Sequence, residues 1–143
     1  MSIEDLYTDI ILDYAKNKKF KGSLEHAHEE HGKNLSCGDE IDLYVQLEDN
    51  IVKDIKFSGH GCIVSQASAS MMCEAVKGKN ITEAKSIIEQ VFNMAQGNEF
   101  DEVITDGIEI FEDISHYPMR VKCFTLAWHT LENSFKDLKK EDE

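Results

Sequence analysis

The sequence predicts an α+β fold in which helices pack on one face of a small antiparallel sheet of about three strands. Strand-like alternation is concentrated in residues 40–57, whereas helical periodicity dominates the second half of the chain. Strands and helices that occupy separate stretches of a chain are typical of two-layer α+β domains. Because 143 residues is the length of one ordinary domain, we expect a single domain over residues 1–143.

Two strands are predicted from apolar residues at alternate positions. Between residues 40 and 48 the apolar residues alternate with polar or amphipathic ones, as in a half-buried strand; they are Ile41, Leu43, Val45 and Leu47. Residues 51–57 are the predicted hairpin partner across a turn at 48–50. A connection this short requires antiparallel pairing. Residues 23–30 are a candidate third strand.

The other predicted elements are helices, whose apolar residues recur three and four positions apart. They cover residues 2–16, 63–77, 81–96 and a last helix that begins near Pro118. Ser2 is the predicted N-cap of the first helix, and Asn80 stands three residues before Glu83, the spacing of a capping pair.

Two further stretches are predicted to lie outside these helices. Residues 98–115 are acidic and are predicted to be irregular, with a short strand at 107–111. Residues 139–143 are predicted to be a solvated, disordered tail.

The charge balance and the N-terminus limit the classes of partner. The chain has 15 basic and 28 acidic residues, a net charge of −13, and a body this acidic repels nucleic-acid backbones. The acidic N-terminus lacks the basic start of a signal peptide, and no apolar run has the length of a membrane helix. We therefore expect a cytoplasmic protein with neither nucleic acid nor membrane as partner.

Three of the four cysteines stand at predicted element boundaries. Cys37 precedes the hairpin, Cys62 lies between the hairpin and the next helix, and Cys123 is near the start of the last helix. If the helices stack on one face of the sheet, these junctions meet at one end. Cys73, in the middle of a predicted helix, is predicted to be a packing residue.

The surroundings of these cysteines favour thiolate chemistry. A thiol at a helix N-terminus, such as Cys62, is favoured as thiolate, and Arg120 and Lys122 are expected to lower the pKa of a neighbouring thiol. With Asp39 as an oxygen donor, three thiolates form a four-coordinate set suited to Zn²⁺, and the same thiolates suit an iron–sulfur cluster. Simple packing of buried thiols stays open, because none of them belongs to a C-x-x-C pair.

Histidines in the first predicted strand also resemble metal ligands. His26 and His28 share a face if residues 23–30 form a strand, and His31 follows them among glutamates. Charged residues on a solvated edge strand explain the same pattern, and we favour that interpretation.

At the three cysteine segments the sequence resembles the IscU/SufU family of iron–sulfur cluster assembly proteins. The matching residues are Ser36-Cys37-Gly38-Asp39, Gly61-Cys62-Ile63-Val64-Ser65-Gln66-Ala67-Ser68-Ala69-Ser70 and Arg120-Val121-Lys122-Cys123. The similarity covers nearly the whole chain, about residues 4–138.

Departures from the IscU pattern make the chain more similar to the SufU branch. IscU-type scaffolds usually carry Leu-Pro-Pro-Val-Lys and then a His directly before the third Cys, whereas here residues 116–120 read His-Tyr-Pro-Met-Arg and Lys122 takes the place of that His. The spacing from Cys62 to Cys123 is longer, as in SufU, and we place the extra segment at residues 97–113. Arg120 matches an Arg typical of SufU-type sequences.

The resemblance implies a zinc site and a role in sulfur transfer. The implied Zn²⁺ ligands are Cys37, Asp39, Cys62 and Cys123. The implied role is that of a sulfurtransferase-like carrier, rather than a stand-alone enzyme, which accepts persulfide sulfur on Cys37 from a pyridoxal-phosphate cysteine desulfurase of the SufS type. Downstream iron–sulfur scaffolds or apo acceptor proteins would receive the sulfur, and Arg120 would give local charge support.

Two other functions stay open at this point. One is a scaffold that assembles a transient [2Fe–2S] cluster on the same ligands. The other is a structural zinc module that serves only in protein binding.

Overall fold

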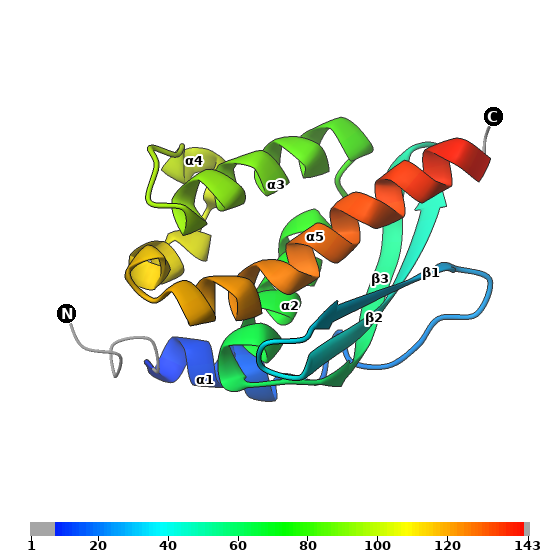
Figure 1. Cartoon of the computed structure of the whole chain (residues 1–143). Coiled ribbons are helices and arrows are strands. Elements are labelled where there is room, and N and C mark those ends of the chain that lie inside the picture. The colour runs from blue at the N-terminus through cyan, green and yellow to red at the C-terminus, as the bar shows by residue number, and fades with distance from the viewer. Residues whose placement is uncertain (1–7, 142–143) are drawn as a thin grey trace.

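One helix comes first in the chain, the three strands of the sheet follow it, and the remaining helices come after the sheet (Figure 1). The computed structural model describes residues 8–141, without the side chains of residues 139–141. The elements are α1 (Asp9–Lys16), β1 (His28–Asn34), β2 (Asp39–Glu48), β3 (Ile51–His60), α2 (Ile63–Val76), α3 (Ile81–Ala95), α4 (Glu102–Thr105), the 3₁₀ helix η2 (Ile108–His116) and α5 (Pro118–Glu141).

The sheet has the order β1-β2-β3 with antiparallel pairing throughout. Residues on one face of β2 and β3 are almost completely buried, namely Ile41, Leu43, Val45, Val52, Ile55 and Phe57. Both predicted strands of the hairpin are therefore confirmed, with β3 continuing to His60.

The third strand was predicted too early in the chain. β1 spans His28–Asn34, and its limits are set by pairing with β2, from His28 opposite Val45 to Asn34 opposite Asp39. His26 lies before the strand with a φ of 56°, in the left-handed region that turns the chain. The expectation that His26 and His28 share a strand face is therefore wrong.

The helices cover the buried face of the sheet, as predicted (Figure 1). α5 lies against β1 and β2, α2 lies against β3 and α5, and α1 packs on α2. Large side chains of α5 fill the space between these layers, since Phe124, Trp128 and Leu131 are fully buried. The burial of this apolar surface is the main source of stability in such a two-layer fold.

The helices predicted over 63–77, over 81–96 and from Pro118 are found with small shifts at their ends, whereas the first is found over the second half of its predicted range only. α1 begins at Asp9, and the Thr8 side chain accepts a hydrogen bond from the Ile11 N–H; the predicted cap Ser2 lies outside the described residues. Asn80 caps α3 by accepting a hydrogen bond from the Glu83 N–H at 2.8 Å, as predicted. α5 begins at Pro118 and continues to Glu141, so residues 139–141 of the predicted tail are helical.

The predicted strand at 107–111 is wrong. α4 and η2 occupy the acidic segment instead, and η2 buries Ile108, Phe111 and Ile114. These residues recur every third position, which matches the three residues per turn of a 3₁₀ helix and not the two-residue repeat of a strand. Within residues 8–141, every helix is too short or too polar to cross a bilayer.

Candidate metal centre

A tight loop between β1 and β2 presents Cys37 to solvent. The Asn34 carbonyl accepts a hydrogen bond from the Gly38 N–H at 2.9 Å, and the Asn34 side-chain oxygen accepts one from the Ser36 N–H at 3.1 Å. Gly38 has a φ of +73°, which favours glycine. The loop thus leaves the Cys37 side chain exposed at the edge of the molecule.

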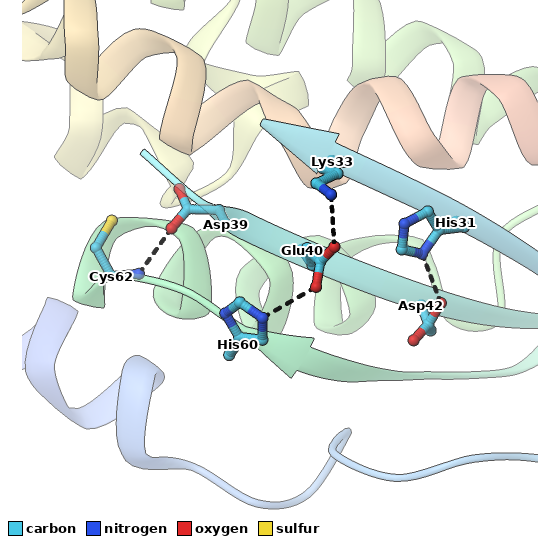
Figure 2. A network of polar contacts seen from close by, with 7 residues as sticks. All are labelled: His31, Lys33, Asp39, Glu40, Asp42, His60 and Cys62. Atoms are coloured by element: carbon cyan, nitrogen blue, oxygen red, sulfur yellow. Dashed lines mark hydrogen bonds and ion pairs between the residues drawn. The ribbon is translucent and has the colours of Figure 1, made fainter. Parts of the chain in front are cut away.

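Asp39, the first residue of β2, has a carboxylate with two different environments. Its Oδ1 accepts a hydrogen bond from the Cys62 N–H at 3.0 Å (Figure 2). Its Oδ2 is buried and has no hydrogen-bond partner. A buried carboxylate oxygen without a partner is costly, and a cation is one of the few groups that compensates for it.

Gly61 allows this close approach of Asp39 to the chain before α2. A Cβ at position 61 would overlap the Ser65 hydroxyl and press on the Asp39 carboxylate. The glycine is therefore needed to keep Asp39 against the N-terminus of α2. Cys62 is the N-cap residue of α2 and is half-buried.

Cys123 meets Cys37 across the end of the sheet. The Cys123 side chain is buried on α5, and its Sγ lies 2.9 Å from the Cys37 Sγ. The Asn34 side-chain amide donates to the Cys37 Sγ at 2.9 Å and lies 4.0 Å from the Cys123 Sγ. Sequence reasoning missed Asn34; the signal was a polar residue at the end of a strand, three positions before a cysteine.

Donor atoms of Cys37, Asp39 and Cys123 all lie within 4.8 Å of one another. The Cys62 sulfur lies outside this close group but near enough to act electrostatically on Cys123. Cys37 and Cys123 thus converge, and the third cysteine segment joins them through the Cys62 N–H bond to Asp39 rather than through its thiol. Two thiols and an unpaired carboxylate oxygen converging on one point form a donor set that fits a divalent cation such as Zn²⁺.

The pKa of the Cys123 thiol is raised rather than lowered. Burial is the largest cause, followed by the close side chains of Cys37 and Asp39 and by the negative charges of Cys62 and Asp39. We expected Arg120 and Lys122 to lower the pKa of a neighbouring thiol, and at Cys123 the pKa shifts in the opposite direction. A cation among these groups would favour the thiolate, because it would offset both the burial and the clustered negative charge.

Comparison with known sequences decides the family. The sequence model of the NifU-like N-terminal domain matches residues 6–143. The chain belongs to this IscU/SufU family of iron–sulfur cluster assembly proteins.

Relatives within this family carry two kinds of name. The chain is 49% identical, over 96% of its length and 98% of the relative's, to a protein of Thermotoga maritima named iron–sulfur cluster assembly scaffold protein IscU. It is 43% identical, over 92% of its length and 90% of the relative's, to the zinc-dependent sulfurtransferase SufU of Bacillus subtilis. These names describe the relatives; the family itself places the chain among iron–sulfur cluster assembly proteins.

Solved structures in the family share the fold. The crystal structure of a putative scaffold protein for the SUF system from Fervidobacterium islandicum superposes with a TM-score of 0.88 at 48% identity, covering 92% of this chain and 97% of that one. A NifU-like N-terminal domain from Brucella abortus superposes with a TM-score of 0.89 at 22% identity, which shows the fold alone.

Arg120 and Lys122 lie in the first turns of α5. Arg120 is half-buried and stands three residues before Cys123, a spacing that puts two residues on the same side of a helix. Lys122 is exposed. The acidic segment between Cys62 and Cys123, the predicted extra segment of the SufU branch, is built as α4 and η2, and η2 leads directly into α5.

Cys73 lies apart from this centre, as predicted. It is fully buried in α2, and burial raises the pKa of its thiol. A thiol in that environment is a packing residue rather than a metal ligand or nucleophile.

Proposed function

We propose that this chain is a zinc-dependent sulfur acceptor that takes persulfide sulfur from a pyridoxal-phosphate cysteine desulfurase of the SufS type. The observation that carries the proposal is an exposed Cys37 thiol in contact with the buried Cys123 thiol, beside the unpaired carboxylate oxygen of Asp39. The name of the 43% identical SufU relative supports the same chemistry.

The residues that would hold Zn²⁺ are Cys37, Asp39, Cys62 and Cys123. Bound there, the ion would keep the thiols deprotonated at neutral pH and order the end of the fold. The three residues Cys37, Asp39 and Cys123 already converge, and Cys62 would supply the fourth ligand from the N-terminus of α2.

Sulfur transfer would take place at Cys37 as thiol–persulfide exchange. The Cys37 thiolate attacks the terminal sulfur of the desulfurase persulfide, so that a new S–S bond forms at Cys37. The S–S bond on the desulfurase breaks, and its cysteine leaves as a thiolate that takes up one proton. Cys37 suits this step because it is the exposed member of the thiol pair, whereas Cys123 is buried.

Neighbouring residues would keep Cys37 ready for this attack. The Asn34 amide donates to the Cys37 sulfur and would stabilise its thiolate. Asp39, as the single oxygen ligand among sulfurs, would be the exchangeable one. Arg120 would give local charge support, since a guanidinium near the site favours thiolates and an anionic persulfide.

A Cys37→Ala variant tests the proposal. The purified wild type is expected to hold about one Zn²⁺ per chain at this centre and to stimulate cysteine-dependent sulfide release by its cognate desulfurase. Cys37→Ala is expected to lose that stimulation, because no nucleophile remains on the loop. The measurements are metal analysis by mass spectrometry and a desulfurase activation assay.

The matched control is Cys73→Ala, which also removes one thiol but from the buried packing position. It is expected to stimulate the desulfurase as the wild type does. Full stimulation by Cys37→Ala would refute the proposed role. If that variant also lost thermal stability, the result would favour a structural zinc module.

A second candidate function is a scaffold for a transient [2Fe–2S] cluster on the same ligands. It is favoured by the name of the 49% identical relative from Thermotoga maritima. This function predicts that anaerobic reconstitution gives a visible charge-transfer spectrum and that the cluster passes to an apo acceptor. A protein that stays colourless and keeps its zinc under those conditions would contradict it.

A further inference from the structure

A second group of potential metal ligands lies at the far end of the contact between β1 and α5. His28 and Glu30 are two positions apart on β1, so both point to the same side of the strand, the side that faces α5. Gly32 continues this row, and a Cβ there would overlap the Thr130 side chain of α5. Asp137 follows Thr130 by seven residues, two helical turns, and so returns to the same face of the helix.

The three side chains meet at short range. His28 Nε2 lies 2.9 Å from Glu30 Oε1, and the Asp137 carboxyl lies close enough to raise the pKa of the Glu30 carboxyl. One donor atom from each residue lies within 4.8 Å of the other two. The side chains of His28 and Glu30 are only 12% and 19% exposed, so water screens the group poorly.

An edge-strand explanation accounts for part of this group only. β1 is an edge of the sheet, and inward-pointing charges on an edge strand prevent pairing with other chains. That explains His28 and Glu30 but not a second carboxylate, which α5 places directly against Glu30. Two adjacent carboxylates require a shared proton or a cation between them.

The closeness of these carboxyl groups affects the pKa of Glu30. Burial raises the pKa of the Glu30 carboxyl, and the hydrogen bond and charge of Asp137 also raise it, against the opposing effect of His28. In a chain with a net charge of −13, a divalent cation at this point would also relieve the general repulsion.

We propose that His28, Glu30 and Asp137 bind a divalent cation of the first transition row, at a site separate from the cysteine centre. One imidazole nitrogen and two carboxylate oxygens are ligands typical of Zn²⁺, Mn²⁺ and Fe²⁺. Small side-chain movements bring donors this close to the ligand distances of about 2.0–2.2 Å found for zinc.

A pocket lined in part by His28 and Leu138 borders the site on its histidine side. The position of the site also gives it a structural effect. A cation here would be bound by both the C-terminal part of α5 and the edge strand β1. The same helix carries Cys123 at its other end, so occupancy stabilises the element that delivers a cysteine ligand.

Zinc titration of the chelator-stripped, full-length chain tests the proposal, with calorimetry for stoichiometry and ¹⁵N NMR of the imidazoles for location. The wild type is expected to bind zinc at the cysteine centre and at this site, and binding is expected to shift the His28 Nε2 resonance. Asp137→Asn keeps the shape but removes one ligand charge. It is expected to weaken the second site at least about tenfold and to abolish the His28 shift at equal zinc concentration.

The matched control is Asp42→Asn. It disrupts an equally short histidine–carboxylate pair, in which His31 Nδ1 lies 2.8 Å from Asp42 Oδ1 on the exposed face of the sheet (Figure 2). This variant is expected to bind zinc as the wild type does, since the pair belongs to no three-donor group within the described residues. Glu30→Gln is a second loss variant, used if Asp137→Asn does not fold.

The His28 resonance reports on this site whether or not the cysteine centre binds zinc, so the two proposals fail separately. A His28 Nε2 signal unchanged at millimolar zinc would overturn the second site and would leave a shared proton as the explanation of the Glu30–Asp137 contact. Equal loss of binding in Asp42→Asn and Asp137→Asn would also overturn it.

Discussion

At the scale of single residues, Asp39 is the most informative position in the cysteine centre. Its Oδ1 satisfies a backbone N–H of the α2 N-terminus, whereas its Oδ2 is buried without a partner. The first interaction is structural, and the second is an uncompensated cost in the folded chain. One substitution separates these two roles.

Asp39→Asn is expected to affect stability and zinc binding in different ways. An asparagine oxygen can still accept the Cys62 N–H, and the loss of a buried charge leaves the chain equally or more stable without zinc. Zinc affinity is expected to fall at least about tenfold, because a charged ligand is lost. Urea unfolding with and without zinc, together with a competition titration, measures both effects.

The control for Asp39→Asn is Asp42→Asn, three residues later on the same strand and half-exposed. It removes the same charge outside the centre and is expected to leave zinc affinity unchanged. Wild-type zinc affinity in Asp39→Asn would show that Asp39 is not a ligand.

The residue types of the centre were accessible from sequence, but its contacts were not. Glycines and element boundaries around Cys37, Cys62 and Cys123 predicted that three distant segments converge. Asn34 was missed because its role depends on the tight loop, which brings its amide to the Cys37 sulfur. The raised pKa of Cys123 was missed because burial depends on how α5 packs, which no local pattern gives.

At the scale of elements, a buried hydrogen-bonded group joins the two helices that carry Cys62 and Cys123. The Ser68 hydroxyl on α2 donates to the Phe124 carbonyl at 2.6 Å and accepts from the Trp128 indole N–H at 2.9 Å. Phe124 directly follows Cys123, so this contact fixes the start of α5 against α2.

Ser68→Ala is expected to destabilise the chain by about 1–3 kcal/mol, because it leaves the Trp128 indole N–H buried and unpaired. Urea unfolding followed by the fluorescence of Trp128, the only tryptophan, measures the change.

Ser70→Ala provides the control on the same helix. The Ser70 hydroxyl is equally buried but has no hydrogen-bond partner, so its removal is expected to be neutral or stabilising. Equal destabilisation by the two variants would mean that the Ser68 hydrogen bonds contribute nothing measurable.

Elements with a clear hydrophobic period were predictable, and the others were not. In β2, buried and less buried residues alternate because one face of the strand is buried. In α3, buried residues recur three and four positions apart because one side of the helix faces the core. The segment around Ile108 and Ile110 looked like a strand because apolar residues alternate there, yet the structure buries every third residue instead. β1 contains no large apolar residue, so its limits came from its partner strand alone.

At the scale of the whole molecule, the thiols give stability a dependence on alkaline pH. The pKa values of Cys73 and Cys123 are both raised from their ordinary value of 9.0, in each case chiefly by burial. A group whose pKa is higher in the folded chain binds more protons there than in the unfolded chain. The stability that it contributes is therefore present below the unfolded pKa and is lost as pH rises above it.

Without zinc, the free energy of unfolding is therefore expected to fall as pH rises above about 9. With zinc, it is expected to increase with pH between about 6 and 8, because zinc binding releases thiol protons. Unfolding curves at several pH values, with zinc or with a chelator, distinguish the two slopes. Parallel curves in the two conditions would contradict a thiolate-bound ion.

The separation of Cys37 and Cys123 along the chain has one more consequence. The two sulfurs are in contact although their residues are 86 positions apart, so any bridge between them closes a loop that contains β2, β3, the next three helices and η2. In the proposed function, a metal ion would act as a reversible cross-link around more than half of the polypeptide. If a partner drew Cys37 away from the ion, Asp39 and Cys123 would remain as ligands and would keep nearly the same loop closed. The sulfur-accepting thiol could then leave the ion without opening the fold.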